Sequence, residues 1–89
     1  MEYEWDSEKE AHNRRKHGMG FDAAADFDWD SAVIVPDDCK DYGEERWLAI
    51  GIVGERLHSV AFTLRKQKIR LISFRIASRK ERKLFDEPR

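Results

Sequence analysis

The fold is decided by residues 47–77, WLAIGIVGERLHSVAFTLRKQKIRLISFRIA, where three β-rich runs follow one another. We expect strands over 47–53, 57–65 and 69–77, because these runs are rich in β-branched and aromatic residues and are separated by short turn sequences. Connections this short join antiparallel neighbours. The second half of the chain therefore predicts an antiparallel sheet.

The middle run alternates between two kinds of side chain, as a strand with two different faces does. One face would carry His58, Val60, Phe62 and Leu64, and the other Ser59, Ala61, Thr63 and Arg65. We expect the first face to be core, with its histidine packed in the sheet. We expect the second face to be a shallow polar floor.

A helix is predicted before the sheet, after a short extended stretch over residues 2–5. Asp6 can cap its N-terminus, and Ser7 with Glu10 offers a capping box in a second register. The helix should end at residues 16–18, Lys-His-Gly, where cations meet the negative end of the helix dipole and glycine takes the left-handed conformation.

The segment between this helix and the sheet holds shorter elements. Residues 21–27 predict a second helix, 32–35 a strand that stops at Pro36, and 37–45 an acidic loop. Cys39, in that loop, has no neighbour that would lower its pKa, so we assign it no chemistry.

A C-terminal helix completes the predicted fold. Ser78 and Glu81 form a capping box at its start, and Pro88 follows its end. The order β-α-α-β-β-β-β-α indicates one α+β domain over residues 1–89, with two N-terminal helices and one C-terminal helix on a mostly antiparallel sheet.

Composition excludes several classes of protein. The 89 residues are 40% hydrophobic and 11% aromatic, which is too apolar for a disordered chain, and no apolar run is long enough to cross a membrane. The start, MEYEWDSEKE, is acidic where a secretion signal is basic and then apolar. We expect a cytoplasmic protein without a membrane partner.

The formal net charge of −1 conceals two oppositely charged halves. Residues 1–45 hold 5 Lys/Arg against 14 Asp/Glu, whereas residues 46–89 hold 12 Lys/Arg against 4 Asp/Glu. This asymmetry indicates either contact with a polyanion such as nucleic acid or neutralisation of one half by the other within a small fold.

Several catalytic classes lack their motifs. His12 and His17 are five residues apart and should point to different sides of their helix, and the single cysteine has no partner, so no metal site is predicted. The chain has no glycine-rich phosphate loop and no Gly-x-Ser-x-Gly elbow. We therefore expect no zinc enzyme, NTPase or serine hydrolase, and no cofactor.

Basic side chains gather in the second half instead, where arginine outnumbers lysine. A two-residue turn would put Thr63, Arg65, Lys68 and Arg70 on one face of the sheet. The cluster continues at the strand end and helix start with Arg75, Arg79, Lys80, Arg82 and Lys83. Arginine suits bidentate contact with phosphate, and a helix N-terminus beside it favours the same ligand. The alternative is a solvated face whose long basic stems cover apolar surface.

His17 and the three tryptophans can each be interpreted in two ways. His17 is either a partner of the helix dipole or the best available proton carrier. Trp5, Trp29 and Trp47 either supply bulk to the core or stack on bases.

Two groups of motifs run through the chain in a fixed order. The first group, in the N-terminal half, comprises Trp5-Asp6, Lys9, Asn13, Lys16-His17-Gly18 and Phe21. The second group comprises Arg46-Trp47, Gly51, Phe62-Thr63-Leu64-Arg65, Ile69-Arg70-Leu71-Ile72-Ser73, Arg75, Ala77 and Glu81-Arg82. In these motifs the chain resembles the BrnT family of type II toxins. The resemblance implies a RelE-like fold, a metal-independent ribonuclease activity that inhibits translation, and a ribbon-helix-helix antitoxin. It also implies a toxin–antitoxin heterotetramer that meets DNA only through the antitoxin.

The implied chemistry assigns roles to named residues. RNA supplies its own 2′-hydroxyl nucleophile, so an enzyme needs only to align it and stabilise charge. We assign Arg65, Arg70 and Arg75 to the phosphate, and Lys16 and His17 to proton transfer or phosphate contact. RNA binding is assigned to Thr63, Lys68, Arg79 and Arg82. Glu45 is a weaker candidate for the general base.

Three residues depart from the family pattern. Ser7 stands where proline is frequent, Phe74 stands where a small residue is usual, and Phe85 stands where tyrosine is common. No hydroxyl at position 85 can therefore act as an acid or base. A non-catalytic RNA-binding or protein-binding module on the same fold is the alternative function.

Overall fold

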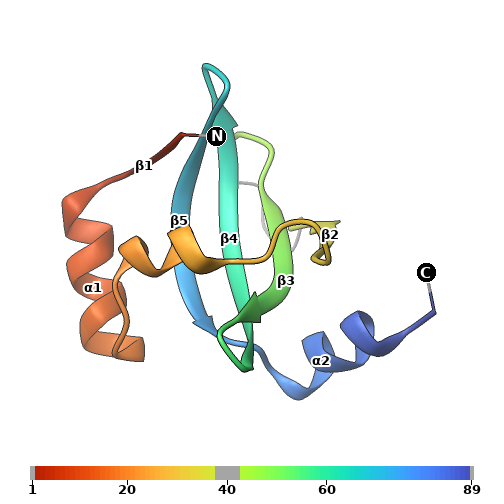
Figure 1. The fold of residues 1–89 in the computed structure, drawn as a ribbon. Helices are drawn as coiled ribbons and strands as arrows, with labels where there is room; N and C mark the ends of the chain where they lie inside the picture. The colour runs from red at the N-terminus through yellow and green to blue at the C-terminus, as the bar shows by residue number, and fades with distance from the viewer. Residues whose placement is uncertain (1, 38–42, 89) are drawn as a thin grey trace.

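A five-stranded sheet forms the centre of the protein, of which the computed structural model describes residues 2–37 and 43–88 (Figure 1). The strands are β1 (Tyr3–Trp5), β2 (Val33–Pro36), β3 (Trp47–Val53), β4 (Arg56–Arg65) and β5 (Lys68–Ile76). Their order in the sheet is β1-β5-β4-β3-β2, and only the β1–β5 pair is parallel. The predicted α+β class with a mostly antiparallel sheet is confirmed.

The β4–β5 hairpin turns at Lys66 and Gln67, which both have positive φ angles, 50° and 67°. Two consecutive left-handed residues are typical of the tight turns whose twist matches that of a hairpin. Arg65 therefore pairs with Lys68, and Thr63 pairs with Arg70, as predicted for a two-residue turn.

A register shift interrupts β5 farther along the same hairpin. Phe62 pairs with Leu71 but Ala61 pairs with Ser73, so Ile72 is an extra residue in β5. An extra residue reverses the alternation of side chains beyond it. As a result Leu71 and Phe74 both enter the core, although they are three positions apart and would lie on opposite faces of a regular strand.

Helix α1 (Ser7–His17) lies beside β5 and is capped as predicted at both ends. The Asp6 side chain accepts a hydrogen bond of 2.8 Å from Glu8 N, and Gly18 has a φ of 74°. Glu10 does not close a capping box with Ser7; its carboxylate accepts a hydrogen bond of 3.1 Å from Phe21 N and so holds the next element.

That next element, η1 (Phe21–Asp26), is a 3₁₀-helix that crosses one face of the sheet (Figure 1). It buries Phe21 and Ala24. Phe27 follows it and packs edge-on against Phe74 and Trp29, with ring centroids 6.3 and 4.7 Å apart. The tryptophans pack around this core as partly buried side chains, in line with the core interpretation.

The two faces of β4 differ from the prediction in two places. His58 is buried as expected, but Leu64 on the same face is 58% exposed because η1 covers only part of that face. On the other face, expected to be a shallow polar floor, Ser59 and Thr63 are buried, so the floor is not shallow at these positions. Helix α2 (Arg79–Asp86) contributes to covering it, since the Ser59 hydroxyl donates to Glu81 Oε2 at 3.3 Å.

The capping box at the start of α2 is confirmed. The Ser78 hydroxyl accepts from Glu81 N at 3.2 Å, and Glu81 Oε1 accepts from Ser78 N at 2.8 Å. Within the described part of the chain, no helix is long and apolar enough to span a membrane. Cys39 lies outside the described residues.

Candidate functional site: a polar groove beside helix α1

A polar groove of about 530 Å³ runs between α1 and the bulged part of β5. Its lining residues that carry basic or hydroxyl groups are Lys9, His12, Lys16, His17 and Ser73. Lysine, histidine and serine can all donate hydrogen bonds to phosphate oxygens. The groove therefore has the composition of an anion site, moderated by Asp6 and Glu8 near the start of α1.

Helical spacing explains why α1 presents these residues together. Lys9, Asn13 and Lys16 are separated by four and three positions, and His12 lies four before Lys16, so all face the same side of the helix. His12 and His17, which are five residues apart on α1, both border this groove. His17 is the last helical residue, and the groove extends around the end of the helix to reach it.

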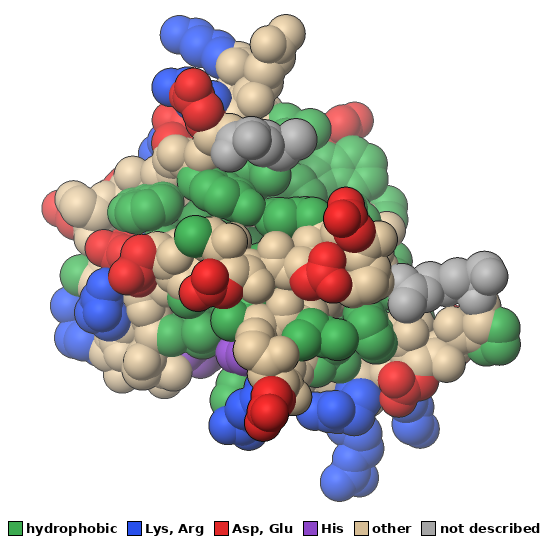
Figure 2. Space-filling view, in the orientation of Figure 1, with side chains coloured by type: hydrophobic (Ala, Val, Ile, Leu, Met, Phe, Trp, Pro, Cys, Tyr) green, Lys and Arg blue, Asp and Glu red, His purple; other side chains and the backbone are tan. Residues whose placement is uncertain are grey.

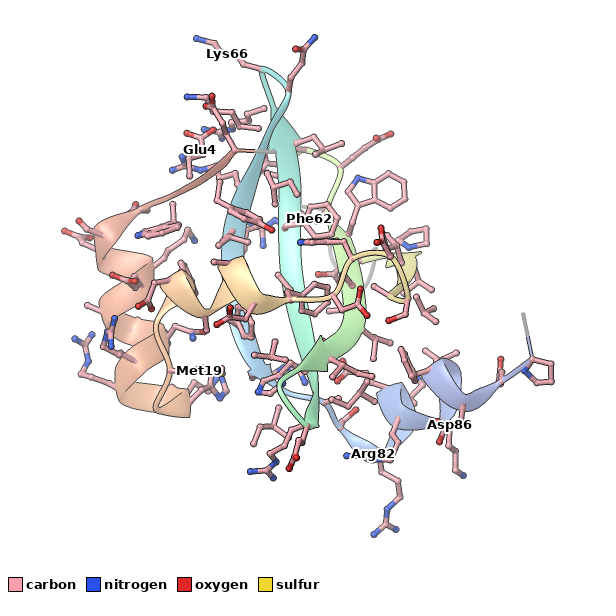
Figure 3. All side chains as sticks on the ribbon, viewed as in Figure 1. Glu4, Met19, Phe62, Lys66, Arg82 and Asp86 are labelled. Carbon is pink, nitrogen blue, oxygen red and sulfur yellow. The ribbon has the colours of Figure 1, made fainter. Side chains whose placement is uncertain are left out.

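Asn13 joins the two walls of the groove. Its side-chain amide donates to Phe74 O at 2.8 Å and to Met19 O at 2.9 Å, and its Oδ1 accepts from Phe74 N at 3.0 Å. β1 pairs with β5 only at residues 69–71, so within the described residues the edge of β5 at Phe74 has no neighbouring strand there. The Asn13 side chain bonds to the N–H and the carbonyl of Phe74 in place of that strand. Met19 lies just past the end of α1 (Figure 3), so the same side chain also fixes the exit of the helix.

The electrostatic surroundings of His17 distinguish its two interpretations. A histidine that merely complements the helix dipole would have a raised pKa, because the negative end of the helix favours the imidazolium. Here desolvation and the positive charges of Lys16 and Arg75, with a contribution from His12, lower the pKa of His17 below its ordinary 6.5. The imidazole is therefore mainly neutral at pH 7, the state in which it can accept a proton.

Arg75 interacts with the groove from the sheet, but its guanidinium is already engaged. Its two terminal nitrogens donate to the two oxygens of Glu81, both at 2.7 Å. The hydrogen bond from Arg75 to Glu81 raises the pKa of the guanidinium. Burial alone would raise the pKa of Glu81, but bonds from Arg75 and from Ser78 N outweigh it and lower that pKa to about 2. Arg75 thus ties α2 to β5.

The other predicted phosphate ligands, Arg65 and Arg70, lie with the predicted RNA-binding residue Lys68 at the opposite end of the sheet, next to the hairpin turn. Arg65, Lys68 and Arg70 share one face, and each has a carboxylate from the acidic half of the chain nearby. The nitrogen–oxygen distances are 3.4 Å for Arg65–Glu44, 3.4 Å for Lys68–Glu2 and 3.3 Å for Arg70–Glu4. Neutralisation between the two halves of the chain therefore occurs at these three pairs.

The remaining predicted residues are dispersed. The Thr63 hydroxyl is buried and donates to Glu45 O at 2.6 Å, while the Glu45 residue itself is exposed. Arg79 and Arg82 are exposed on α2, and Arg82 points away from the sheet (Figure 3). The structure thus brings Lys16, His17 and Arg75 together and leaves Arg65, Lys68 and Arg70 as a second basic group.

Sequence reasoning missed Lys9, His12 and Ser73 as members of the groove. The helical spacing of Lys9 and His12 relative to Lys16 was a usable signal. Ser73 could not be found in this way, because its place depends on the bulge at Ile72. Among the described residues, no three His, Cys, Asp or Glu side chains are grouped so that they could hold a metal ion.

No curated protein matches the chain. A family model described as "Ribonuclease toxin, BrnT, of type II toxin-antitoxin system" matches residues 5–81. The match covers most of the 89 residues and includes α1, the whole sheet from β2 to β5 and the start of α2. The chain therefore belongs to the BrnT family of ribonuclease toxins of type II toxin–antitoxin systems.

Proposed function

We propose that this chain is an endoribonuclease toxin that cleaves RNA without a metal ion, with His17 and Lys16 of the polar groove at the scissile phosphate. The observation that carries the proposal is the imidazole of His17, kept neutral by desolvation and by the positive charges of Lys16 and Arg75, at a groove that Lys9, His12 and Ser73 also line. Membership of a ribonuclease toxin family supports the reaction class. The fold is proposed to be RelE-like.

The reaction needs little beyond what these residues offer. His17 removes the proton of the 2′-hydroxyl, the 2′-oxygen bonds to the adjacent phosphorus, and the bond from phosphorus to the 5′-oxygen breaks. The 5′-oxygen leaves and takes a proton from water, which produces a cyclic phosphate and a free 5′-hydroxyl. The hydroxide formed then recovers the proton from the imidazolium of His17. Lys16 stabilises the charge on the phosphate oxygens, as preorganised cations do in a partly desolvated site.

The second basic group extends the proposed RNA path. Arg65, Lys68 and Arg70 hold the backbone of RNA beyond the cleaved bond, whereas buried Thr63 supports them by fixing Glu45 at the edge of this face. Exposed Arg79 and Arg82 do the same on α2. Their carboxylate partners are exchanged for phosphates on binding, since partly exposed ion pairs of this kind are individually weak. Cleavage of messenger RNA by the toxin would inhibit translation.

The partner of a type II toxin is a protein antitoxin. We propose that this antitoxin is of the ribbon-helix-helix type and that the two proteins form a heterotetramer, in which only the antitoxin contacts DNA.

The test is RNA cleavage by the purified chain in EDTA. We expect activity in wild type and a loss of about 10²–10³-fold for His17→Gln and for Lys16→Ala. Arg15→Ala is the matched control, because Arg15 is the exposed neighbour of Lys16 and does not line the groove. The rate should fall as the pH falls through the lowered pKa of His17, and this acid limb should disappear in His17→Gln. Full activity in the Lys16→Ala/His17→Gln double variant would refute the site.

The alternative function is a non-catalytic RNA-binding or protein-binding module on the same fold. It is favoured by the engagement of Arg65, Arg70 and Arg75 with carboxylates. An active enzyme should lose rate in Arg65→Ala and Arg70→Ala and recover only part of it with lysine. Arg75→Ala is not an equivalent probe, because it leaves buried Glu81 without its cation. Binding of RNA by wild type without cleavage in EDTA or in Mg²⁺ would establish the alternative.

A further inference from the structure

An apolar groove of about 520 Å³ lies on the face of the sheet opposite the second basic group. It is lined by Trp29, Ile34, Trp47, Phe62, Leu64 and Ile69. Ile34 and Leu64, on its margin, are 49% and 58% exposed. Large side chains of this kind are normally buried, so a contiguous group of them indicates a contact surface.

The groove exists because the layer covering this face is incomplete. η1 and Phe27 pack on the middle of the sheet and leave Leu64, between buried Phe62 and the turn at Lys66, uncovered among the residues that the structure describes (Figures 1 and 3). Trp29 marks the boundary. Its ring packs edge-on against Phe62 at 5.4 Å, and its Nε1 donates to the Tyr3 hydroxyl at 2.6 Å. The one polar atom of this indole is therefore satisfied, and its remaining surface is apolar.

Charge around the groove argues against RNA as its occupant. Asp28 and Asp30 flank Trp29 and are both exposed. Acidic side chains lie along the lower margin of the apolar area in Figure 2, while most of the basic ones lie at the periphery. Tryptophans that stack on bases are usually accompanied by cations that hold the phosphates. These acidic neighbours would repel phosphates and would attract lysine or arginine.

The shape and chemistry fit a protein segment. Grooves lined by aliphatic and aromatic side chains receive amphipathic helices, which insert apolar residues at helical spacing and keep charged residues at the rim. Tryptophans are also enriched at the energetically dominant centres of protein interfaces. Six residues line the groove, whereas a standard protein interface buries roughly 800 Å² and 20–30 residues on each partner. The groove would therefore serve as the anchor of a larger contact.

We infer that the apolar groove is the anchor site for the protein antitoxin, and that it receives an amphipathic segment with large apolar residues on one face and Lys or Arg beside them. This inference rests on the proposed function only in taking the antitoxin as the partner. It places the main contact on the face of the sheet opposite Arg65 and Arg70, so the antitoxin need not cover those arginines to bind.

The test measures the affinity of the antitoxin, defined as the protein that suppresses the toxicity of this chain on co-expression, for folded variants by calorimetry. Leu64→Glu and Ile34→Glu should each weaken binding at least about tenfold, since an acid in the groove must lose its water without gaining a partner. Ile76→Glu is the matched control, because Ile76 is also exposed, at 44%, but lies at the far end of the sheet. Its affinity should stay within about twofold of wild type.

Two further measurements make the assignment specific. Asp30→Lys should weaken binding by several-fold at low salt and by less at high salt, as expected for a charge at an interface rim. In wild type, antitoxin should protect tryptophan fluorescence from quenching by acrylamide. Leu64→Glu without antitoxin should cleave RNA at the wild-type rate, so failure of the docking site and failure of the nuclease site are separate results.

Three outcomes would overturn the inference. The first is wild-type affinity in Leu64→Glu together with weakened binding in Arg65→Ala or Arg70→Ala, which would move the contact to the basic face. The second is self-association of the isolated chain that Leu64→Glu abolishes, which would make the groove an interface between two copies. The third is crosslinking of RNA to Trp29 or Trp47.

Discussion

The two grooves of this small toxin have nearly the same volume, about 520 and 530 Å³, but opposite linings. The apolar groove is built from Trp29 and from residues of β2, β3, β4 and β5 that share one face of the sheet, and it is where the core layer ends. The polar groove is built from one stripe of α1 and from a bulge in β5. Two grooves of similar volume therefore differ in chemistry because different elements form their walls. We propose that the apolar groove binds protein and that the polar groove is catalytic.

The strongest test of this comparison removes the side chain that creates the polar groove. Asn13→Ala deletes three hydrogen bonds in a buried position and should lower the free energy of unfolding by about 3 kcal/mol. Denaturation in urea measures the loss. A stabilised Asn13→Ala background should still bind antitoxin but should cleave RNA poorly, because α1 is no longer held against β5. Equal losses of both functions would show that the two grooves are not independent.

The second-largest effect is expected from acid, which should weaken the ion pair between Arg75 and Glu81. This pair lies near the polar groove and does not line the apolar groove. The pKa of Glu81 is lowered from its ordinary 4.5 to about 2, so the carboxylate stabilises the fold fully above pH 4.5. That contribution, about 2–3 kcal/mol, should be lost as the pH falls from 4.5 toward 2.

Urea denaturation between pH 2 and 6 measures this effect. Glu81→Gln should be less stable than wild type at pH 6, and its stability should depend less on pH in the same window. A variant that loses stability toward pH 2 as steeply as wild type would contradict the assignment.

A change behind the apolar groove should have a somewhat smaller effect. A methyl group added at Gly51 would lie 2.6 Å from Cζ of Phe27, whose ring packs on Trp29 at 4.7 Å. Gly51→Ala should therefore destabilise the protein by about 1–3 kcal/mol and displace the wall of the apolar groove. Thermal unfolding gives the first quantity and antitoxin affinity the second. We expect RNA cleavage to remain at the wild-type level in the folded protein.

The smallest expected effect concerns the cap of α2, which lines neither groove. Ser78→Ala removes the bond from Glu81 N to the serine hydroxyl and should cost about 1 kcal/mol of stability. Antitoxin affinity and RNA cleavage should both be unchanged in this variant, which makes it a baseline for the others. A denaturation midpoint equal to that of wild type would show that the cap contributes little.

Local sequence rules predicted most of the secondary structure. The turn at Lys66–Gln67, the antiparallel pairing of 47–77, the left-handed Gly18 and the capping box at Ser78 all depend on neighbours within a few residues. Such features follow from backbone sterics and from hydrogen bonds that each segment makes by itself. The family resemblance, confirmed over residues 5–81, could likewise be recognised from the order of the motifs.

Choices between equivalent local options needed the tertiary structure. Asp6 and Ser7 could both cap α1; in the structure Asp6 is the cap, and the Glu10 carboxylate bonds to Phe21 N. The short helix after Gly18 was predicted, but its 3₁₀ form was not. Its geometry is set by how Phe21 and Ala24 reach the core, which no local pattern specifies.

The functional sites divide in the same way. The sequence by itself determined which residues are available: the stripe of α1 with Lys16 and His17, and the arginines of the sheet. Only the tertiary structure decided which of them meet. The bulge at Ile72 reverses the alternation of β5, so that Phe74 enters the core while Arg75 joins the face of Arg70. That reversal depends on packing against residues distant in the chain, such as Asn13 and Phe27, and alternation within a single strand carries no information about it.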